Sequence, residues 1–170
     1  MNKSNNLRWK EFTIREATPA DVDIILHHRR SMFYDMGYRD DTVLSAMLST
    51  SRPFFAERLE DGRFRAWLVE NQNHDVIAGG GLLVLDYPSG ARDPLPRRPL
   101  IVNVYTEAAY RRKGIARQVM LTMIAWCRNE GFGSVVLHAS NDGRPLYEQL
   151  GFTQTNEMRL MLGQSKTGGA

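Results

Sequence analysis

The sequence predicts a mixed α/β fold in which helices cover both faces of a central, twisted, mixed sheet of about seven strands. The first observation is the order of patterns along the chain: a strand, two helices, a pair of strands, a strand, a helix, a strand, a short helix and a last strand. The second is a polar connector between the paired strands, which indicates an antiparallel hairpin. The third is a strongly amphipathic helix beginning near Ile115, whose apolar face suits packing on a sheet.

The composition is that of one ordinary globular domain. Of the 170 residues, 42% are apolar and 24% are charged, and the formal net charge is +3. We place the domain at residues 11–162, between a flexible N-terminus (1–10) and a flexible tail (163–170). So small a positive excess does not by itself indicate nucleic acid as a partner.

The cysteine count and the hydropathy indicate in which cellular compartment the protein works. Cys127 is the single cysteine, which excludes an internal disulfide framework and a cysteine zinc cluster. The first residues hold no apolar segment typical of a secretory signal. The longest apolar and glycine run, Val76–Leu85, is about half the ~20 residues that a spanning helix needs. We therefore expect a cytoplasmic protein with no membrane partner.

The first strand and first helix are predicted at residues 12–17 and from residue 18 onward. Residues 12–17 alternate between apolar and polar side chains. Thr18 can cap free backbone N–H groups, Pro19 suits the first helical position, and Asp21 lies at the positive end of the helix dipole.

A second helix is expected over Asp41–Thr50, where apolar residues recur at helical spacing. The pattern resumes over Pro53–Leu59, so we expect an interruption near the proline. Residues 34–38 between the two helices are turn-like.

The middle of the chain predicts a hairpin and a third strand. Phe64–Glu70 and Asp75–Leu85 have strand patterns, and Gly79–Gly81 within the second indicates a bulge, a close approach of another chain or ligand, or simply a twisted strand. Pro88–Pro99 has four prolines, so we expect an exposed loop there. Leu100–Thr106 is the next strand.

The loop after that strand concentrates positive charge at the start of a helix. It has three consecutive cations at residues 111–113 and a fourth at Arg117, while Gly114 and Ala116 leave the backbone open. Free N–H groups, the positive dipole end and these cations favour a phosphorylated ligand. A solvated charge run is the alternative. The loop matches neither the P-loop nor the dinucleotide-binding pattern.

Two motifs carry a family resemblance. Arg111-Arg112-Lys113-Gly114-Ile115-Ala116 matches Gln/Arg-x-x-Gly-x-Gly/Ala, and Tyr147-Glu148-Gln149-Leu150-Gly151-Phe152 follows the strand at residues 135–140. Over about residues 12–162 the chain resembles the GCN5-related N-acetyltransferases (GNAT), including a final strand at Met158–Leu162. The resemblance implies the acyl-CoA N-acyltransferase fold.

The resemblance also implies acetyl-CoA as cosubstrate and no metal. In that fold the fourth and fifth strands splay apart around the pantetheine arm, and the pyrophosphate rests on backbone N–H groups of the basic loop. The cofactor-binding residues it implies are Val104, Tyr105, Thr106, Arg111, Arg112, Lys113, Gly114, Ile115, Ala116, Arg117, Ser140 and Asn141. The loop at Ser140–Pro145 is one residue tighter than the common family version.

The reaction implied is direct attack of a primary amine on the thioester, with the oxyanion stabilised by a backbone N–H of the fourth strand. Tyr147 matches the general acid, and its phenol stays protonated at neutral pH because its ordinary pKa is about 10; packing in the last helix is the alternative role. Glu107 is our candidate base, with Asp86 and Asn103 as others. The base is therefore left open.

The acceptor is expected near the first helices and the proline-rich loop. Tyr34, Asn103 and Asp86 are the candidate substrate residues, and aromatic residues nearby could equally belong to the core. An amino acid, a polyamine, an aminoglycoside or a protein N-terminus would each fit. Cys127 and the four histidines are predicted to pack or to lie on the surface.

Two other functions compete with acetyl transfer. A non-catalytic acyl-CoA-binding or regulatory module on the same fold would keep the basic loop without needing Tyr147. A nucleic-acid binder ranks last, because aromatic residues do not interleave with the cations as base stacking requires. We expect no nucleic-acid partner, and a homodimer is left open.

Overall fold

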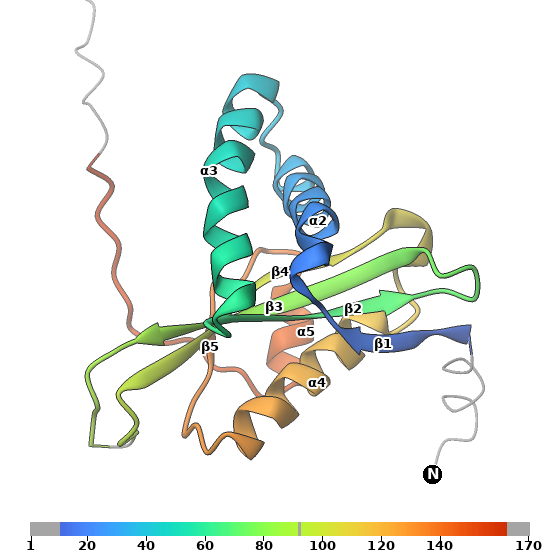
Figure 1. Cartoon of the computed structure of the whole chain (residues 1–170). Helices are drawn as coiled ribbons and strands as arrows, with labels where there is room; N and C mark the ends of the chain where they lie inside the picture. Colours follow the sequence, from blue (N-terminus) through green and yellow to red (C-terminus); the bar gives the residue numbers. More distant parts are fainter. Residues whose placement is uncertain (1–10, 92, 163–170) are drawn as a thin grey trace, which may run out of the picture. The chain divides into compact units, whose positions relative to one another are not determined.

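The computed structural model describes residues 11–91 and 93–162, and the chain divides into two compact units, residues 1–138 and 139–170. The predicted flexible ends, 1–10 and 163–170, lie outside the described residues. Each unit is described by itself. The first contains the whole sheet and the three longest helices (Figure 1).

The first unit is built on a five-stranded sheet, which is mixed, as the sequence predicts. Four strands are antiparallel neighbours in chain order, and the fifth runs parallel to the fourth. The strands are β1 (Thr13–Glu16), β2 (Phe64–Glu70), β3 (Val76–Asp86), β4 (Arg97–Thr106) and β5 (Val136–Leu137).

The strand count differs from the expected seven. Among the described residues the sheet has five strands, and the expected strand at Met158–Leu162 is absent, since residues 152–162 form neither helix nor strand. The apolar side chains of that segment are exposed, Met158 to 94%. A strand requires a neighbouring strand to pair with as well as a suitable pattern, and within the described chain residues 158–162 pair with no strand. β5 is also shorter than the expected 135–140.

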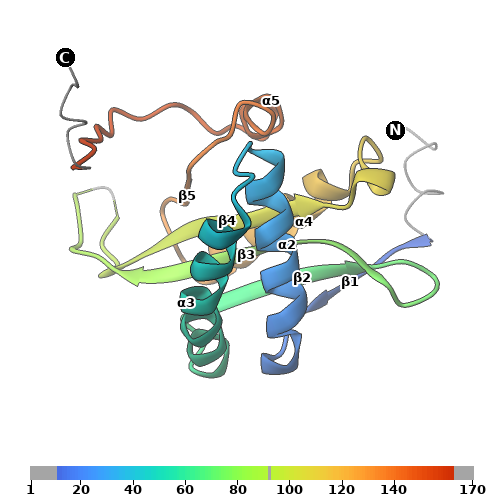
Figure 2. The ribbon, with the colours of Figure 1, turned by 90° about the horizontal axis from the view of Figure 1, so that it is seen from above.

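Helices cover both faces of the sheet. α2 (Val22–Asp35) and α3 (Asp41–Glu60) lie on one face and α4 (Ile115–Asn129) on the other (Figures 1 and 2). On the first face Ile25 and Phe55 pack with Phe64 and Leu68 of β2 in one buried cluster. This burial fixes α2 and α3 against the strands.

The helix start predicted at Thr18 is a 3-10 turn, and α2 follows it directly at Val22. Thr18 caps a short 3-10 turn, Pro19–Asp21, and the Asp21 carboxylate accepts from the Thr18 backbone N–H at 2.7 Å. Arg15 of β1 donates to the same carboxylate at 2.9 and 2.8 Å. The strand and the helix start are thereby held together.

α3 is continuous through Pro53, which corrects the expected interruption. Asp40 caps the helix by accepting from the backbone N–H groups of residues 42 and 43. Leu44 and Phe55 are both buried and stand eleven residues apart in the sequence, about three turns, so they share one face. The free energy gained by burying that face offsets the loss of the hydrogen bond that proline removes.

The Gly79–Gly81 segment is a bulge, because the β3–β4 register shifts there. A Cβ on Gly80 would lie 2.9 Å from side-chain atoms of Val119 and Met123 of α4, and one on Gly81 would lie 2.4 Å from the Phe64 ring. The close approach is therefore made by the chain's own side chains. β4 begins at Arg97, within the residues expected to be loop, because Asp86 of β3 pairs with it.

The described part of the second unit, residues 139–162, contains one short helix, α5 (Arg144–Gln149). The Tyr147 ring lies over Gly143, where an added Cβ would be 2.8 Å from a ring carbon, and it meets Phe152 edge-on at 6.1 Å between centroids. Within the described ranges, no helix has the length and apolar character needed to span a bilayer.

Candidate functional site

β4 and β5 pair over only two positions. Leu100 opposes Val136 and Ile101 opposes Leu137, and the pairing ends there although β4 continues to Thr106. The described sheet therefore has no strand beside Val104–Thr106 on the β5 side. Its other side stays paired, since Tyr105 opposes Gly79. This open edge is where the resemblance places the pantetheine arm.

The basic loop ends in the backbone geometry that α4 needs at its start. Arg112 has φ +60° and Gly114 has φ +81°, both left-handed. Apart from the two residues next to it, the described chain has no atom within 4 Å of where a Cβ on Gly114 would be, so the backbone there is open. α4 follows at Ile115, whose side chain is buried, and the first backbone N–H groups of a helix have no intrahelical acceptor.

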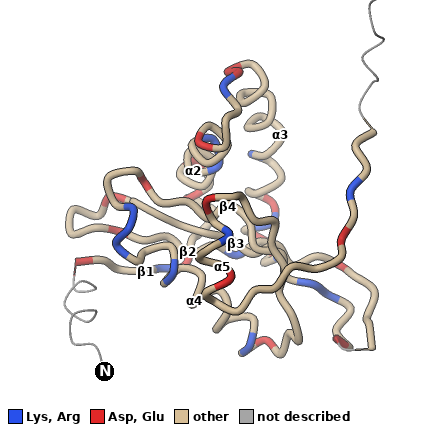
Figure 3. The backbone as a smooth tube through the Cα atoms, turned by 180° about the vertical axis from the view of Figure 1, so that it is seen from behind, with Lys and Arg blue, Asp and Glu red and all other residues tan. Residues whose placement is uncertain are grey.

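The cations of this loop are not equivalent. Figure 3 shows a continuous basic stretch of backbone leading into α4. The Arg111 Nε donates to the Thr106 carbonyl oxygen at 2.9 Å, and its guanidinium pairs with Asp35 at the end of α2. The Asp35 carboxylate raises the pKa of Arg111. Arg112, Lys113 and Arg117 are exposed and remain for an external anion.

A polar seam lies between β4 and α2. Polar side chains at alternate positions of β4 and just after it contact three consecutive residues of α2. The seam consists of His27, His28 and Arg29 from α2 and Asn103, Tyr105 and Glu107 from β4 and the residue that follows it.

Glu107 lies at one end of the seam. Its Oε1 is 3.0 Å from Nε2 of His27 and 4.0 Å from Nε2 of His28, and its Oε2 accepts from the Tyr105 hydroxyl at 3.4 Å. Its backbone N–H donates to the Ile77 carbonyl at 2.9 Å, which fixes the chain at the end of β4. The carboxylate is thus positioned and still partly exposed.

His28 is neutral at neutral pH. Burial lowers its pKa to about 4, against an opposing effect of the Glu107 carboxylate. Its ring lies 5.3 Å from the Tyr105 ring, and burial raises the pKa of Tyr105. The expected packing role of a histidine fits His28, but its position beside Glu107 was missed. The available signal was the alternation of Asn103, Tyr105 and Glu107, which puts three polar side chains on one side of the chain at the end of β4.

Asn103 lies at the other end of the seam, with φ +56° and a side chain only 6% exposed. Its Oδ1 accepts from Nη1 of Arg29 at 2.8 Å. The Arg29 guanidinium carbon lies 4.9 Å from the Phe33 ring centroid and 5.6 Å from that of Phe55. The structure therefore places one predicted substrate residue in the same seam as the predicted base.

The other two predicted substrate residues lie elsewhere. Asp86 lies at one end of β3, whereas Ala78, which pairs with Thr106, lies eight residues away toward the other end. Eight strand residues span about 26 Å, so Asp86 is far from the end of β4. Tyr34 is 47% exposed, and the Arg39 guanidinium covers its ring at 3.7 Å. Neither residue joins the polar seam.

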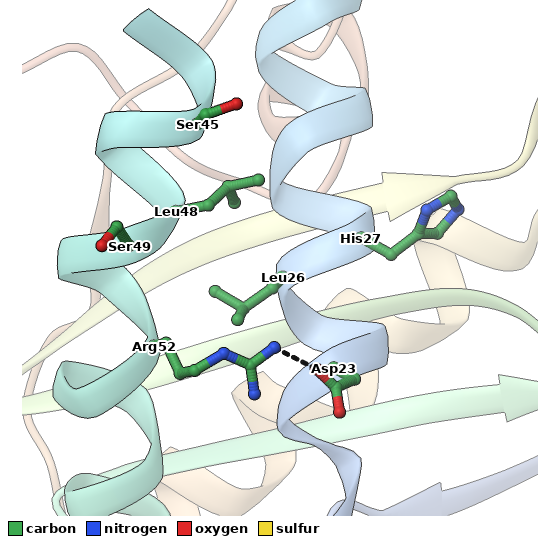
Figure 4. Close-up of a pocket in the computed structure, with 7 residues that line it drawn as sticks. All are labelled: Asp23, Leu26, His27, Ser45, Leu48, Ser49 and Arg52. Atoms are coloured by element: carbon green, nitrogen blue, oxygen red, sulfur yellow. Dashed lines mark hydrogen bonds and ion pairs between the residues drawn. The ribbon is translucent and has the colours of Figure 1, made fainter. Parts of the chain in front are cut away.

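A groove of about 350 Å³ lies between α2 and α3. Asp23 and Arg52 form an ion pair there, and His27 lines the groove from α2 (Figure 4). Tyr34, Asn103 and Asp86 are absent from its lining.

The second unit holds the remaining predicted residues. The Ser140 hydroxyl accepts from the Gly143 backbone N–H at 3.2 Å, and Asn141 follows in the turn before α5. Burial raises the pKa of Tyr147, so its phenol is protonated at neutral pH. It can therefore donate a proton, as a general acid must.

Cys127 is buried on α4, and burial raises the pKa of its thiol to about 11. A thiol of that kind is protonated and poorly nucleophilic, so packing is its role. In the described residues no three histidine, cysteine, aspartate or glutamate side chains gather as a metal site.

The fold and the loop together are those of the acetyltransferase (GNAT) family. The sequence pattern of that family matches residues 25–152, and the chain belongs to it. The motif-based resemblance is confirmed.

Individual relatives support the assignment. A GCN5-related N-acetyltransferase from Ralstonia eutropha JMP134 is 32% identical, with a TM-score of 0.83 over 89% of this chain and 98% of that one. A predicted acetyltransferase from Clostridium acetobutylicum, solved with acetyl-CoA, is 24% identical, with a TM-score of 0.78 over 88% and 95%. Human N-acetyltransferase 8 is 25% identical over 123 residues, 71% of this chain. The chain spans 50% of that relative's length.

Proposed function

We propose that the protein transfers the acetyl group of acetyl-CoA to a primary amine by direct attack. The observation that carries the proposal is the open β4 edge at Val104–Thr106 followed at once by the basic loop and the start of α4. A strand edge can hydrogen-bond an extended amide-containing arm, and the helix start with its cations can bind phosphates. These residues fit acetyl-CoA, which when bound supplies an activated acetyl thioester.

The chain's own groups supply the proton transfers. Glu107 accepts the proton of the incoming ammonium, directly or through water, so that the amine becomes nucleophilic. His27, 3.0 Å from its Oε1 and half-exposed, accepts that proton in turn and exchanges it with solvent. Tyr147 donates a proton to the leaving thiolate. A backbone N–H of β4 stabilises the developing oxyanion.

The test begins with acetyl-CoA binding. We expect calorimetric titration of the wild-type protein to give micromolar affinity. The double variant Gly114→Glu/Arg112→Ala places a carboxylate where the phosphates would lie and removes an exposed cation, so binding should be lost. Arg128→Ala, an exposed cation at the other end of α4, is the matched control and should bind as the wild type does.

Turnover is then measured as thiol release with a set of amines. Glu107→Gln should keep acetyl-CoA affinity and lower kcat by about 10²-fold or more, with the loss smallest at high pH, where free amine is abundant. Tyr147→Phe should lower kcat in a similar way. Acetyl-CoA binding without turnover on any amine would instead identify a non-catalytic binding module, and absence of binding would remove the proposal.

A further inference from the structure

Two buried donors in the polar seam have no acceptor in the described part of the chain. Arg29 Nε and Asn103 Nδ2 are both buried and unpartnered, although the two side chains hydrogen-bond to each other through other atoms. Buried N–H groups without an acceptor are rare in native structures and costly. Each of the two donors therefore lacks an oxygen acceptor.

The same pair carries an uncompensated positive charge. Arg29 makes no ion pair with a carboxylate among the described residues, whereas its neighbour Arg30 pairs with Asp41 at 2.7 Å. Burial lowers the pKa of Arg29, and no nearby anion opposes that effect. Phe33 and Phe55 offer only ring faces to the guanidinium. An oxygen anion would satisfy both the charge and the donors.

The position of the pair connects it to the transfer reaction. Asn103 directly precedes Val104–Thr106, the open edge of β4, and its backbone is left-handed, which is uncommon for a strand residue. Glu107, the proposed base, lies at the other end of the same seam. A ligand anchored at Arg29 and Asn103 therefore lies beside the strand that would hold the thioester.

We propose that Arg29 and Asn103 bind an acidic oxygen group of the acceptor, a carboxylate or a phosphate, so that the substrate is an amine that also carries an acidic group. This inference rests on the proposed acetyl transfer. It favours amino acids and phosphorylated amines over polyamines and aminoglycosides, because the latter two classes would bring only further positive charge to a buried cation.

The experiment compares acceptors that differ only in the acidic group. The common amino acids are assayed as free acids and as their amides, and ethanolamine phosphate is compared with ethanolamine. We expect kcat/KM for at least one acid to exceed that of its neutral partner by about tenfold or more, as for a charged hydrogen bond. Whether the carboxylates or the phosphate show the preference identifies the group.

Variants then test whether Arg29 causes the preference for acidic acceptors. Arg29→Gln should bring the acid-to-amide ratio close to one, and Arg29→Lys should keep part of it. Arg30→Gln, a change at the adjacent, partly exposed arginine that pairs with Asp41, should leave the ratio unchanged. Damage to folding would lower kcat/KM for the acid and for its neutral partner by the same factor. The ratio of the two values therefore reports on recognition of the acidic group.

The failure of this inference is distinguishable from failure of acetyl transfer. Transfer to acids and neutral partners with equal kcat/KM would overturn the anionic site and keep the acetyltransferase. If no amine were acetylated, the unfolding temperature of the coenzyme A-saturated protein would be compared with each acid and its neutral partner. Equal shifts would overturn the anionic site too, whereas a larger shift with an acid, lost in Arg29→Gln, would support it.

Discussion

His28 is a histidine that the fold keeps uncharged, and this makes stability sensitive to acid. Burial lowers its pKa in the folded chain to about 4 from the ordinary 6.5. The unfolded chain therefore binds a proton first as pH falls. The stabilising effect is complete above about pH 6.5 and is lost progressively toward pH 4. Between about pH 7 and pH 4.5 the loss amounts to roughly 2.5 kcal/mol.

Urea unfolding of the wild type and of His28→Gln at those two pH values measures this effect. The variant should lose most of the wild-type pH dependence, while His74→Gln, a change at an exposed histidine, should keep it. Asp21 does not confuse the comparison, because Arg15 lowers its pKa to about 2 and its titration lies below this range. A His28→Gln protein with the wild-type pH dependence would show that the assignment is wrong.

At the residue level, sequence reasoning found part of the seam. Glu107 was predicted as a site residue because it lies just past a strand, and Asn103 because the family resemblance places a carboxylate of some relatives at its position. Arg29, His27 and His28 were missed, because a helical pattern shows which face is apolar but not which strand residues that helix faces. Only the register of α2 against β4 brings these groups together.

Among the elements, α3 shows most directly how tertiary burial outweighs a local signal. Pro53 has no N–H, so the Ser49 carbonyl lacks its helical donor, and both residues are exposed. We expect Pro53→Ala to restore that bond and to raise the free energy of unfolding by about 1–2 kcal/mol, after allowing for the greater entropy of the unfolded chain.

Urea unfolding tests whether Pro53→Ala raises the free energy of unfolding. Ala46→Gly, another exposed position of the same helix, is the matched control and should lower the free energy of unfolding by about 1 kcal/mol. If Pro53→Ala destabilised the protein while the control behaved as expected, proline would have a favourable role in α3 that the missing hydrogen bond does not reveal.

Across the whole molecule, the order and type of most elements could be predicted, whereas the pairing of strands could not. Alternation and helical spacing are local properties, so they locate β2, β3 and α4 well. The early end of the β4–β5 pairing and the missing strand at residues 158–162 depend on which backbone groups find partners. Local patterns do not contain that information.

The open edge of β4 yields a prediction for hydrogen exchange over the described chain. Backbone N–H groups that bond to a ligand or lie beneath it become protected. Acetyl-CoA should therefore slow exchange at Val102–Thr106 and at Arg112–Arg117. α3, which contributes to neither region, should exchange at an unchanged rate apart from any overall stabilisation by the ligand.

Exchange measured by mass spectrometry with and without saturating acetyl-CoA tests this, with Gly114→Glu/Arg112→Ala as the control that should show no difference. Protection confined to the basic loop would mean that the phosphates bind while the pantetheine arm does not follow β4. In that case the thioester would not be held beside Asn103 and Glu107, and both the proposed base and the proposed anionic site would lose their connection to the reacting carbon. Protection in both regions would place the polar seam beside the reaction, as acetyl transfer to an acidic amine requires.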